Sequence, residues 1–367
     1  MSIMCHDLSN NALGRAWVLA RLSQDDYEVE LVGPALTGKV WEPLAEGSGF
    51  PIRVLDARRR RHWAREIDGD VLVAVKPRLD SLTLALRASQ YARRPVVADV
   101  DDWEMAFFYD YPARMAKQLL ALTSPRNFYR TLAAERSVRR ADAVAVSSTW
   151  LQNRFGGAII PHARDTSIFD PAHFDRAAAR ERLGVADDDI VVMFVGTVMK
   201  HKGVDLIIEA MARTGRTDLV LASPGDLLPA KNGLPRTTKL PRVSLAELPG
   251  ILVASDLVVL PQRKSRSSNA QIPAKVFDAL AMGLPVVTSD VSDLREIVGS
   301  GGIAVPPDDV DAMSAAIDRL ASDTSLRQQM SAEARARCVE YYSEDALKPR
   351  WLRVVADAER RAAGEPN

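Results

Sequence analysis

The sequence is poor in cysteine, has no long apolar run and shows no excess of either charge. Only two cysteines, Cys5 and Cys338, occur among the 367 residues, which is too few for a disulfide framework. Because no signal-peptide pattern is present either, we expect a reducing, cytoplasmic location. The longest apolar runs have the length of strands, which excludes a membrane-spanning helix. Lys+Arg and Asp+Glu balance at 48 each, so no overall field recruits nucleic acid and an anionic ligand needs a local site.

Two familiar nucleotide-binding loops are lacking as well. The spacing G-x-x-x-x-G-K-[ST] does not occur, and no G-x-G-x-x-G follows an expected strand. These absences argue against a Walker A nucleotide hydrolase and against a nicotinamide-dependent dehydrogenase.

Short β-branched runs alternate with longer helical patterns along the whole chain, which is typical of parallel βαβ units. A polar stretch, residues 162–175, separates two series of such runs. The strands expected after a short leading strand are Glu28–Val32, Pro51–Asp56, Val71–Val75, Pro95–Val100, Ala143–Val146, Ala158–Pro161, Ile190–Val195, Leu219–Ala222, Leu257–Leu260 and Pro285–Thr288. The pattern predicts an α/β protein with two Rossmann-like domains facing each other across a cleft, with ligands beyond the carboxyl ends of the strands.

The length of the chain supports two domains, because 367 residues are many for one compact core. We expect the first domain over residues 1–165 and the second over residues 166–345. Residues 346–367 belong to an Ala- and Arg-rich helical stretch that we expect to pack back toward the first domain.

The most informative segment is Ser268–Asp290. Pro273 suits the first turn of a helix, Gly283 suits a left-handed helix end, and a buried strand follows at once. The start of this helix is therefore expected to offer free N–H groups to an anion. Lys275 and Asp278 are three residues apart and share one helical face, so a cation and an acceptor flank that position.

A second anion site is expected where the strand Ile190–Val195 runs into a loop and then a helix. The loop contains Gly196 and Lys202, so it offers backbone donors and a point charge to a phosphate group.

The order of the blocks in the second half carries a resemblance to a known family. The blocks are VGTVMKHKGVDLIIEAM, VSLAELPGILVASDLVVLP, PAKVFDALAMGLPVV and LREIV. Together they resemble the donor-binding domain of GT-B glycosyltransferases, specifically the large retaining family 4. The resemblance covers residues 185–345 well and the first half more loosely. It implies that the second domain binds a nucleotide diphosphate sugar and that the first domain binds an acceptor.

The resemblance also implies residue roles. Lys202 corresponds to a lysine that holds the diphosphate, and Asp278 to an acid that accepts hydrogen bonds from the ribose. Residues around Arg242 and Val243 line the nucleobase, with Glu247 close behind. The positions implied in donor binding are Gly14, Gly196, Thr197, Lys202, Arg242, Val243, Arg263, Asn269, Gln271, Lys275 and Asp278.

Three positions depart from the family pattern. Thr197 stands where an arginine is usual. The charge of the missing arginine is then expected from Lys200, Arg263 or Arg266. Ala270 stands where a glutamate meets the donor sugar, so Asn269 and Gln271 are the polar groups left there. Lys76 stands where a histidine often contacts the sugar. A non-catalytic GT-B relative that binds a nucleotide sugar or activates a partner transferase is therefore the alternative, and a sugar-nucleotide epimerase is a third reading.

In the first half, the loop from His6 to Gly14 resembles the glycine loop that abuts the donor phosphates, although only one glycine is present. His162, at the start of the polar stretch, is either a solvated loop residue or a substrate contact.

The segment Asp99–Glu104 places three aspartates and a glutamate after an expected strand. One interpretation is the D-x-D metal motif of GT-A enzymes, which the two-domain pattern argues against. Another is an acceptor site in which Asp101 or Asp102 takes a proton from the attacking hydroxyl. The third is a set of helix caps at a strand end. We expect Asp101, Asp102 and Lys76 to be the catalytic residues, with no metal and no cofactor.

An aromatic cluster, residues 107–111, precedes a region with helical periodicity over Ala113–Val138 that contains repeated Arg and Lys. It is either a peripheral membrane or acceptor contact through residues 104–130 or a buried aromatic anchor with a solvated basic face. The predicted function is transfer of a sugar from a nucleotide sugar to an acceptor hydroxyl or amine, with retention of configuration.

Overall fold

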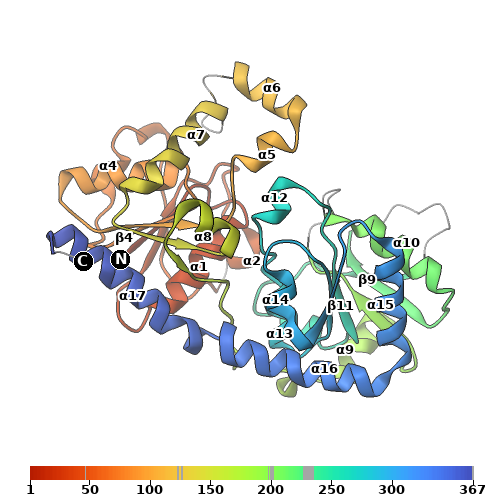
Figure 1. Cartoon of the computed structure of the whole chain (residues 1–367). Helices are drawn as coiled ribbons and strands as arrows, with labels where there is room; N and C mark the ends of the chain where they lie inside the picture. Colours follow the sequence, from red (N-terminus) through yellow and green to blue (C-terminus); the bar gives the residue numbers. More distant parts are fainter. Residues whose placement is uncertain are drawn as a thin grey trace. The chain divides into compact units, whose positions relative to one another are not determined.

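A computed structural model describes residues 1–45, 47–121, 124, 127–196, 198, 202–225 and 235–365, leaving out the side chains of residues 114 and 117. The chain divides into two compact units (Figure 1). The first contains Met1–His162 and Glu344–Asn367, and the second contains Ala163–Ser343. The boundary between the two units, after His162, thus lies three residues before the expected one. The last helix of the chain belongs to the first unit.

The first unit is built on a parallel sheet of seven described strands, in the order β3-β2-β1-β4-β5-β6-β7. The first strand, β1, pairs with both β2 and β4, so the leading strand of the sequence lies in the middle of the sheet. The strands are β1 (Ser2–Cys5), β2 (Glu30–Gly33), β3 (Ile52–Val54), β4 (Leu72–Val75), β5 (Val96–Val100), β6 (Ala143–Val146) and β7 (Ala158–Ile159).

Helices connect these strands. The α-helices are α1 (Ala12–Ser23), α2 (Glu42–Ala45), α3 (Trp63–Glu66), α4 (Leu84–Tyr91), α5 (Ala106–Tyr109), α6 (Pro112–Leu120), α7 (Phe128–Arg136), α8 (Thr149–Phe155) and α17 (Glu344–Ala363). The single helical region expected over Ala113–Val138 is therefore wrong, because α6 ends at Leu120 and α7 starts anew at Asn127. The Asn127 side chain accepts a hydrogen bond from the Arg130 N–H, which makes it a new N-cap.

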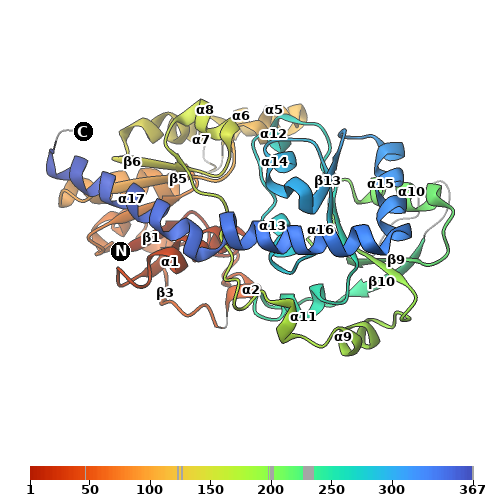
Figure 2. The same ribbon diagram turned by 60° about the horizontal axis from the view of Figure 1, so that its bottom comes forward.

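The last helix, α17, lies along α1 in both ribbon views (Figures 1 and 2). Its buried Trp351 donates a hydrogen bond of 2.7 Å to Ser23 of α1, and Glu344 forms an ion pair of 2.8 Å with Arg21. These contacts bring the end of the chain onto the first unit.

The second unit has a parallel sheet of six described strands, in the order β10-β9-β8-β11-β12-β13. The strands are β8 (Ile190–Met193), β9 (Leu219–Pro224), β10 (Arg236–Leu240), β11 (Leu257–Leu260), β12 (Val286–Ser289) and β13 (Gly302–Val305). The two edge strands, β10 and β13, were not among the strands expected from the sequence.

Alternate residues of β8 enter two different cores, as the two-residue period of a strand requires. Val191 and Met193 pack with the helices of one face, while Val192 and Phe194 pack with those of the other. The helices are α9 (Arg176–Leu183), α10 (Val204–Thr214), α11 (Leu248–Leu252), α12 (Arg266–Asn269), α13 (Lys275–Ala281), α14 (Leu294–Val298), α15 (Val310–Ser322) and α16 (Thr324–Arg337). Helices α10 and α15 cover one face, and α13 and α16 contribute to the other.

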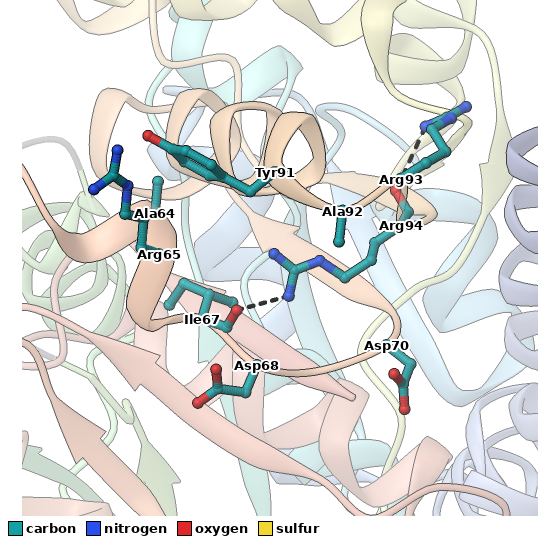
Figure 3. A pocket seen from close by; sticks show the side chains of 9 residues that line it. All are labelled: Ala64, Arg65, Ile67, Asp68, Asp70, Tyr91, Ala92, Arg93 and Arg94. Carbon is teal, nitrogen blue, oxygen red and sulfur yellow. Dashed lines mark hydrogen bonds between the residues drawn. The ribbon is translucent and has the colours of Figure 1, made fainter.

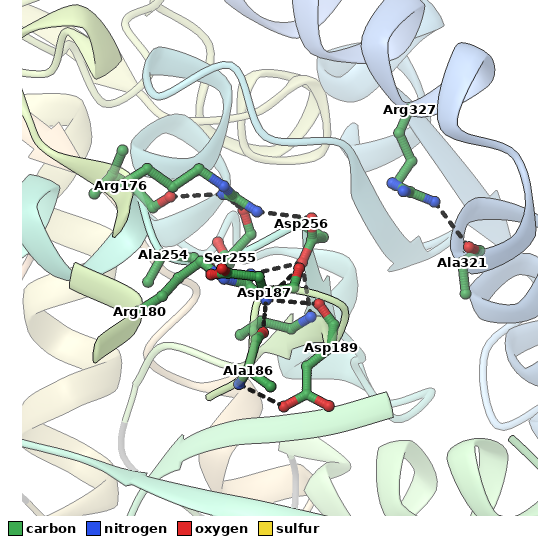
Figure 4. A network of polar contacts seen from close by, with 12 residues as sticks. Arg176, Arg180, Ala186, Asp187, Asp189, Ala254, Ser255, Asp256, Ala321 and Arg327 are labelled. Carbon is green, nitrogen blue, oxygen red and sulfur yellow. Dashed lines mark hydrogen bonds and ion pairs between the residues drawn. The ribbon is translucent and has the colours of Figure 1, made fainter. Parts of the chain in front are cut away.

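A network of charged groups joins α9 to the amino-terminal ends of β8 and β11 (Figure 4). The buried Arg180 donates to the carbonyl oxygens of Ala186 and Asp189 at 2.5 and 2.7 Å and pairs with Asp256 at 3.2 Å. Arg176 contacts the same carboxylate at 2.7 Å. The network holds the first helix of the second unit against its sheet.

Among the described residues, no helix is both long enough and apolar enough to cross a membrane.

We predict that Arg180→Ala lowers the free energy of unfolding of the second unit by about 3 kcal/mol, because it leaves several carbonyl groups without their buried donor and Asp256 with Arg176 alone. Hydrogen exchange of β8 and β11 measures this loss. Arg182→Ala, an exposed change on the same helix, is the control and should cost less than about 0.5 kcal/mol. Equal protection in both variants would contradict the structural role of the network.

Candidate functional site

Each sheet has one place where the strand order reverses, and ligands of parallel sheets bind at the carboxyl edge at such a place. In the first unit it lies between β1 and β4, and in the second between β8 and β11. The candidate residues of the first unit follow β1, β4 and β5, and those of the second follow β8, β10 and β11.

Lys76 directly follows β4 and has a positive φ of 61°. Its side chain is 8% exposed. The ammonium pairs closely with Asp102 and lies 3.8 Å from Asp101 and 3.9 Å from Glu104. Burial lowers the pKa of Lys76, but the three carboxylates outweigh it and raise the pKa above its ordinary value. Lys76 is therefore a permanent cation inside an acidic cluster.

The remaining members of this cluster are also paired. Arg15 and Asp99 form a fully buried ion pair of 2.7 Å, and Arg15 also donates to the carbonyl oxygens of Ile160 and Pro161. Arg78 pairs with Glu104.

Asp101 contacts the buried His162, whose Nε2 lies 3.1 Å from Oδ1. Although burial opposes the shift, His162, Lys76 and Arg15 lower the pKa of Asp101. A carboxylate with a low pKa is a weak base at neutral pH. The arrangement favours a charge-holding role for Asp101 over proton abstraction.

The segment Asp99–Glu104 is thus a buried network of ion pairs, in which cations balance the concentrated negative charge of the sequence. Burial at the strand ends is the reason, since a buried charge requires a partner. Within the described residues, no group of three or more His, Cys, Asp or Glu side chains is arranged to hold a metal ion.

Gly14 is the third residue of α1. A Cβ atom at this position would lie 3.2 Å from the ring of Trp41, so packing of a helix against this ring accounts for the glycine. Its predicted proximity to a phosphate stays a prediction.

The aromatic residues of the region 104–130 divide into two groups. Phe108 is buried and packs edge-on against Phe128. Tyr111, Leu120 and Tyr129 are exposed. The region therefore contains the buried anchor that the sequence suggested, and its membrane contact stays a prediction.

In the second unit, Asp278 of α13 lies between two cations. Arg164 donates from Nε to Asp278 Oδ1, and Lys275 Nζ lies 3.1 Å from Oδ2. Although burial opposes it, Arg164 and Lys275 lower the pKa of Asp278, so the carboxylate stays ionised. Asp278 is 1% exposed whereas the Lys275 side chain is 28% exposed. Lys275 is the more accessible group, and Asp278 orients it.

Arg164 was not among the predicted site residues. It lies at the start of the second unit, two residues after His162, where no periodic pattern distinguishes it. Its backbone N–H donates to Tyr342 at 2.9 Å, and its Nη2 donates to Ala274 at 3.0 Å. It therefore joins both ends of the second unit to the start of α13.

Helix α13 begins at Lys275, two residues after Pro273, and its N-cap Ala274 makes no side-chain cap. Gly283 has a φ of +61°, as its expected role at the helix end requires. Ala270 is fully buried. The position at which the resemblance implies a sugar-facing glutamate therefore holds an apolar side chain, and the surrounding protein encloses it.

After β8, Gly196 has a φ of +139°, and a Cβ atom placed on it would lie 3.5 Å from Lys202 Nζ. The positive φ therefore accounts for the glycine, and Lys202 lies beside it. The predictions for Thr197 and Lys200 lie outside the described residues.

The other predicted donor contacts are spread around this edge. Arg263 pairs with Asp205 and, at 3.0 Å, with Asp308, so ion pairs use the charge that was expected to replace the arginine missing at position 197. Asn269 and Gln271 flank Ala270, the first of them exposed. Arg242 is exposed and Val243 packs partly against the core. Glu247 accepts hydrogen bonds from Ser244, so it shapes the local turn.

A cavity of about 510 Å³ lies in the first unit (Figure 3). Its lining residues precede β4 and β5, so it opens at the amino-terminal edge of the sheet, opposite to Lys76. Arg94 spans it by donating to the Ile67 carbonyl at 2.6 Å. The cavity is separate from both candidate sites. Its lining residues are Ala64, Arg65, Ile67, Asp68, Asp70, Tyr91, Ala92, Arg93 and Arg94.

Residues 189–323 match the model of the family described as glycosyl transferases group 1. The chain is 32% identical over 184 residues to alpha-D-kanosaminyltransferase of Streptomyces kanamyceticus, covering 47% of this chain and 46% of that protein. It is 29% identical over 265 residues to D-inositol 3-phosphate glycosyltransferase of Geodermatophilus obscurus, covering 64% of this chain and 57% of that protein. The chain thus spans about half the length of these curated relatives.

The fold is similar to that of Anabaena HepE in its complex with UDP-glucose. The TM-score is 0.75 with 17% sequence identity, and the match covers 97% of this chain and 98% of that one. Its structure and those of the other matching glycosyltransferases have the two-sheet GT-B fold, which confirms the predicted fold class.

We predict that Lys76→Met destabilises the first unit by about 3 kcal/mol at pH 8, because Asp102 then lacks its buried cation. The pKa of Lys76 is raised in the folded protein, so its contribution to the stability of the first unit is fully present at every pH below the pKa of a free lysine. This contribution is therefore constant between pH 5 and pH 8. In the variant, protonation of the carboxylates becomes easier as the pH falls, and the loss should shrink toward pH 5.

All six tryptophans lie in the first unit, so urea unfolding followed by tryptophan fluorescence measures its stability. The exposed Lys39→Met is the control. A loss that is the same at pH 5 and pH 8 would contradict the role of Lys76 as the counter-charge of the cluster.

Proposed function

We propose that this chain, a GT-B protein whose residues 189–323 belong to the glycosyl transferases group 1 family, is a retaining glycosyltransferase. It moves a sugar from a nucleotide diphosphate sugar to a hydroxyl or amine of an acceptor. In the reaction, the bond between the anomeric carbon and the diphosphate breaks, a bond to the acceptor forms, and the acceptor proton is released.

The observation that carries this proposal is the loop after β8. It lies within the matched segment, at the reversal of strand order, and brings Lys202 beside Gly196. The leaving group of the reaction is a diphosphate, so stabilisation of its growing negative charge is the main catalytic requirement. An ammonium group beside an open glycine backbone meets that requirement.

Lys275 offers a second cation at the start of α13, where Asp278 pairs with it and Arg164 in turn pairs with Asp278. The ionised Asp278 accepts hydrogen bonds and donates none. The hydroxyl groups of a ribose can donate hydrogen bonds to such a carboxylate.

The acceptor belongs to the first unit in this proposal. The buried ion-pair network around Lys76 holds Asp101 and Asp102 in place beyond β4 and β5.

A second candidate is a GT-B relative that binds a nucleotide sugar without transferring it. The buried Ala270 favours this alternative, because no acidic group meets the donor sugar at that position. Release of nucleotide diphosphate in the presence of acceptors distinguishes the two, since only a transferase produces it.

We predict that at least one nucleoside diphosphate among UDP, GDP, ADP and TDP stabilises the chain in a thermal-shift experiment. Saturation at a hundred times the dissociation constant adds about 2.7 kcal/mol. UDP is the first ligand to test, since HepE has been solved with UDP-glucose. If none of the four stabilises the chain at millimolar concentration, the proposal is wrong.

We further predict that Lys202→Ala weakens binding of the stabilising diphosphate at least about tenfold, or about 1.4 kcal/mol, because a charge-assisted phosphate contact is lost. Isothermal titration calorimetry measures the change. Arg213→Ala removes a cation from the opposite end of α10 and is the matched control. Unchanged affinity of Lys202→Ala would remove Lys202 from the site.

A further inference from the structure

Gln262 is a buried amide at the carboxyl edge of the second sheet. It lies two residues after the end of β11, and its residue is 5% exposed. Its backbone N–H donates to the fully buried Ser289 hydroxyl at 2.9 Å. This bond joins the loop after β11 to the end of β12 and holds Gln262 at the edge of the sheet.

The side-chain nitrogen of Gln262 has no hydrogen-bond partner among the described residues. A buried donor without an acceptor has lost its hydrogen bonds to water and gained none in the protein, which destabilises the fold. Such a cost at a sheet edge indicates a group that receives its partner from a ligand.

The surroundings of Gln262 favour an anionic partner. A Cβ atom placed on Gly203 would lie 3.4 Å from Pro261, so the loop before Gln262 contacts the N-cap residue of α10. Helix α10 has 11 residues and no side-chain cap, and the Leu206 N–H donates to the Gly203 carbonyl oxygen. The N–H groups at its very start therefore have no side-chain acceptor and lie at the positive end of the helix dipole. Lys202 precedes this cap. The only acid of the first turn, Asp205, is paired with Arg263.

We propose that the Gln262 amide donates a hydrogen bond to an oxygen of the donor diphosphate. The inference rests on the proposed function and adds a residue that the family resemblance does not assign. Gln262 follows β11 and the start of α10 follows β8, so the two hold the diphosphate from either side of the place where the strand order reverses. The bound diphosphate supplies the acceptor that the Gln262 amide lacks.

The proposal predicts opposite effects on stability and binding. Gln262→Met keeps the length of the side chain and removes the unpaired donor. The unliganded variant should therefore melt about 2–4 °C higher than the wild type. Its affinity for the stabilising nucleoside diphosphate should fall about tenfold. A buried amide with only a structural role would change stability and leave affinity untouched.

The matched control is Gln118→Met in α6. Gln118 is a partly buried glutamine of the first unit whose Oε1 atom has no hydrogen-bond partner among the described residues. It should leave nucleoside diphosphate affinity unchanged. Isothermal titration calorimetry with the diphosphate, and with inorganic pyrophosphate as a probe that has no base or sugar, measures both variants. The affinity for pyrophosphate should fall by the same factor.

Gln262→Glu tests whether the ligand group that binds the Gln262 side chain is a phosphate oxygen or a sugar hydroxyl. A carboxylate repels the diphosphate, so affinity should fall further than in Gln262→Met, whereas a hydroxyl would donate to the carboxylate and keep its affinity. Retained binding in Gln262→Glu overturns the proposal, as does equal affinity of Gln262→Met and wild type. If the wild type itself binds no nucleoside diphosphate, the proposed function fails together with this inference.

Discussion

Buried charges at the ends of parallel strands are the constraint on which both units depend. A parallel βαβ sheet brings polar side chains to its carboxyl edge, and that edge is partly covered by the following helices. A carboxylate there must be paired or protonated. In the first unit Asp99 is paired with Arg15, and Asp102 with Lys76. In the second unit Asp278 is paired with Arg164. The backbone connections that supply these cations are thereby held in place.

The same pairing divides the polar groups into those that support the edge and those that can meet a ligand. Lys76 is used inside the first unit, and Asp101 is made a weak base by its neighbours. In the second unit, Lys275 keeps part of its surface in solvent. Gln262 has a donor that the protein leaves without an acceptor among the described residues. The chemistry therefore concentrates on groups that bind an anion, which agrees with a reaction whose leaving group is a diphosphate.

Prediction from the sequence succeeded where one physical pattern decides the structure. Strands such as β8 and β11 are buried on both faces and read as continuous apolar runs. The edge strand β10, with the sequence RTTKL, has one paired side and a polar composition, so no periodic pattern distinguishes it from a loop. The helical region after residue 112 was expected to be continuous, because its periodicity hides the new cap at Asn127.

The sequence by itself determined the fold class, the division into two α/β series and the resemblance of the second series to a glycosyltransferase family, because these depend on periodicity and on the order of local blocks. Only the tertiary structure decided which charges are consumed by pairing. Arg164 and Asp278 are 114 residues apart, and Lys76 and Asp102 are 26 apart. The distance between such groups depends on the strand order, which no local pattern contains. That is why the cations that pair with the acidic segment after β5, and the surroundings of Arg164 and Gln262, emerged only from the folded chain.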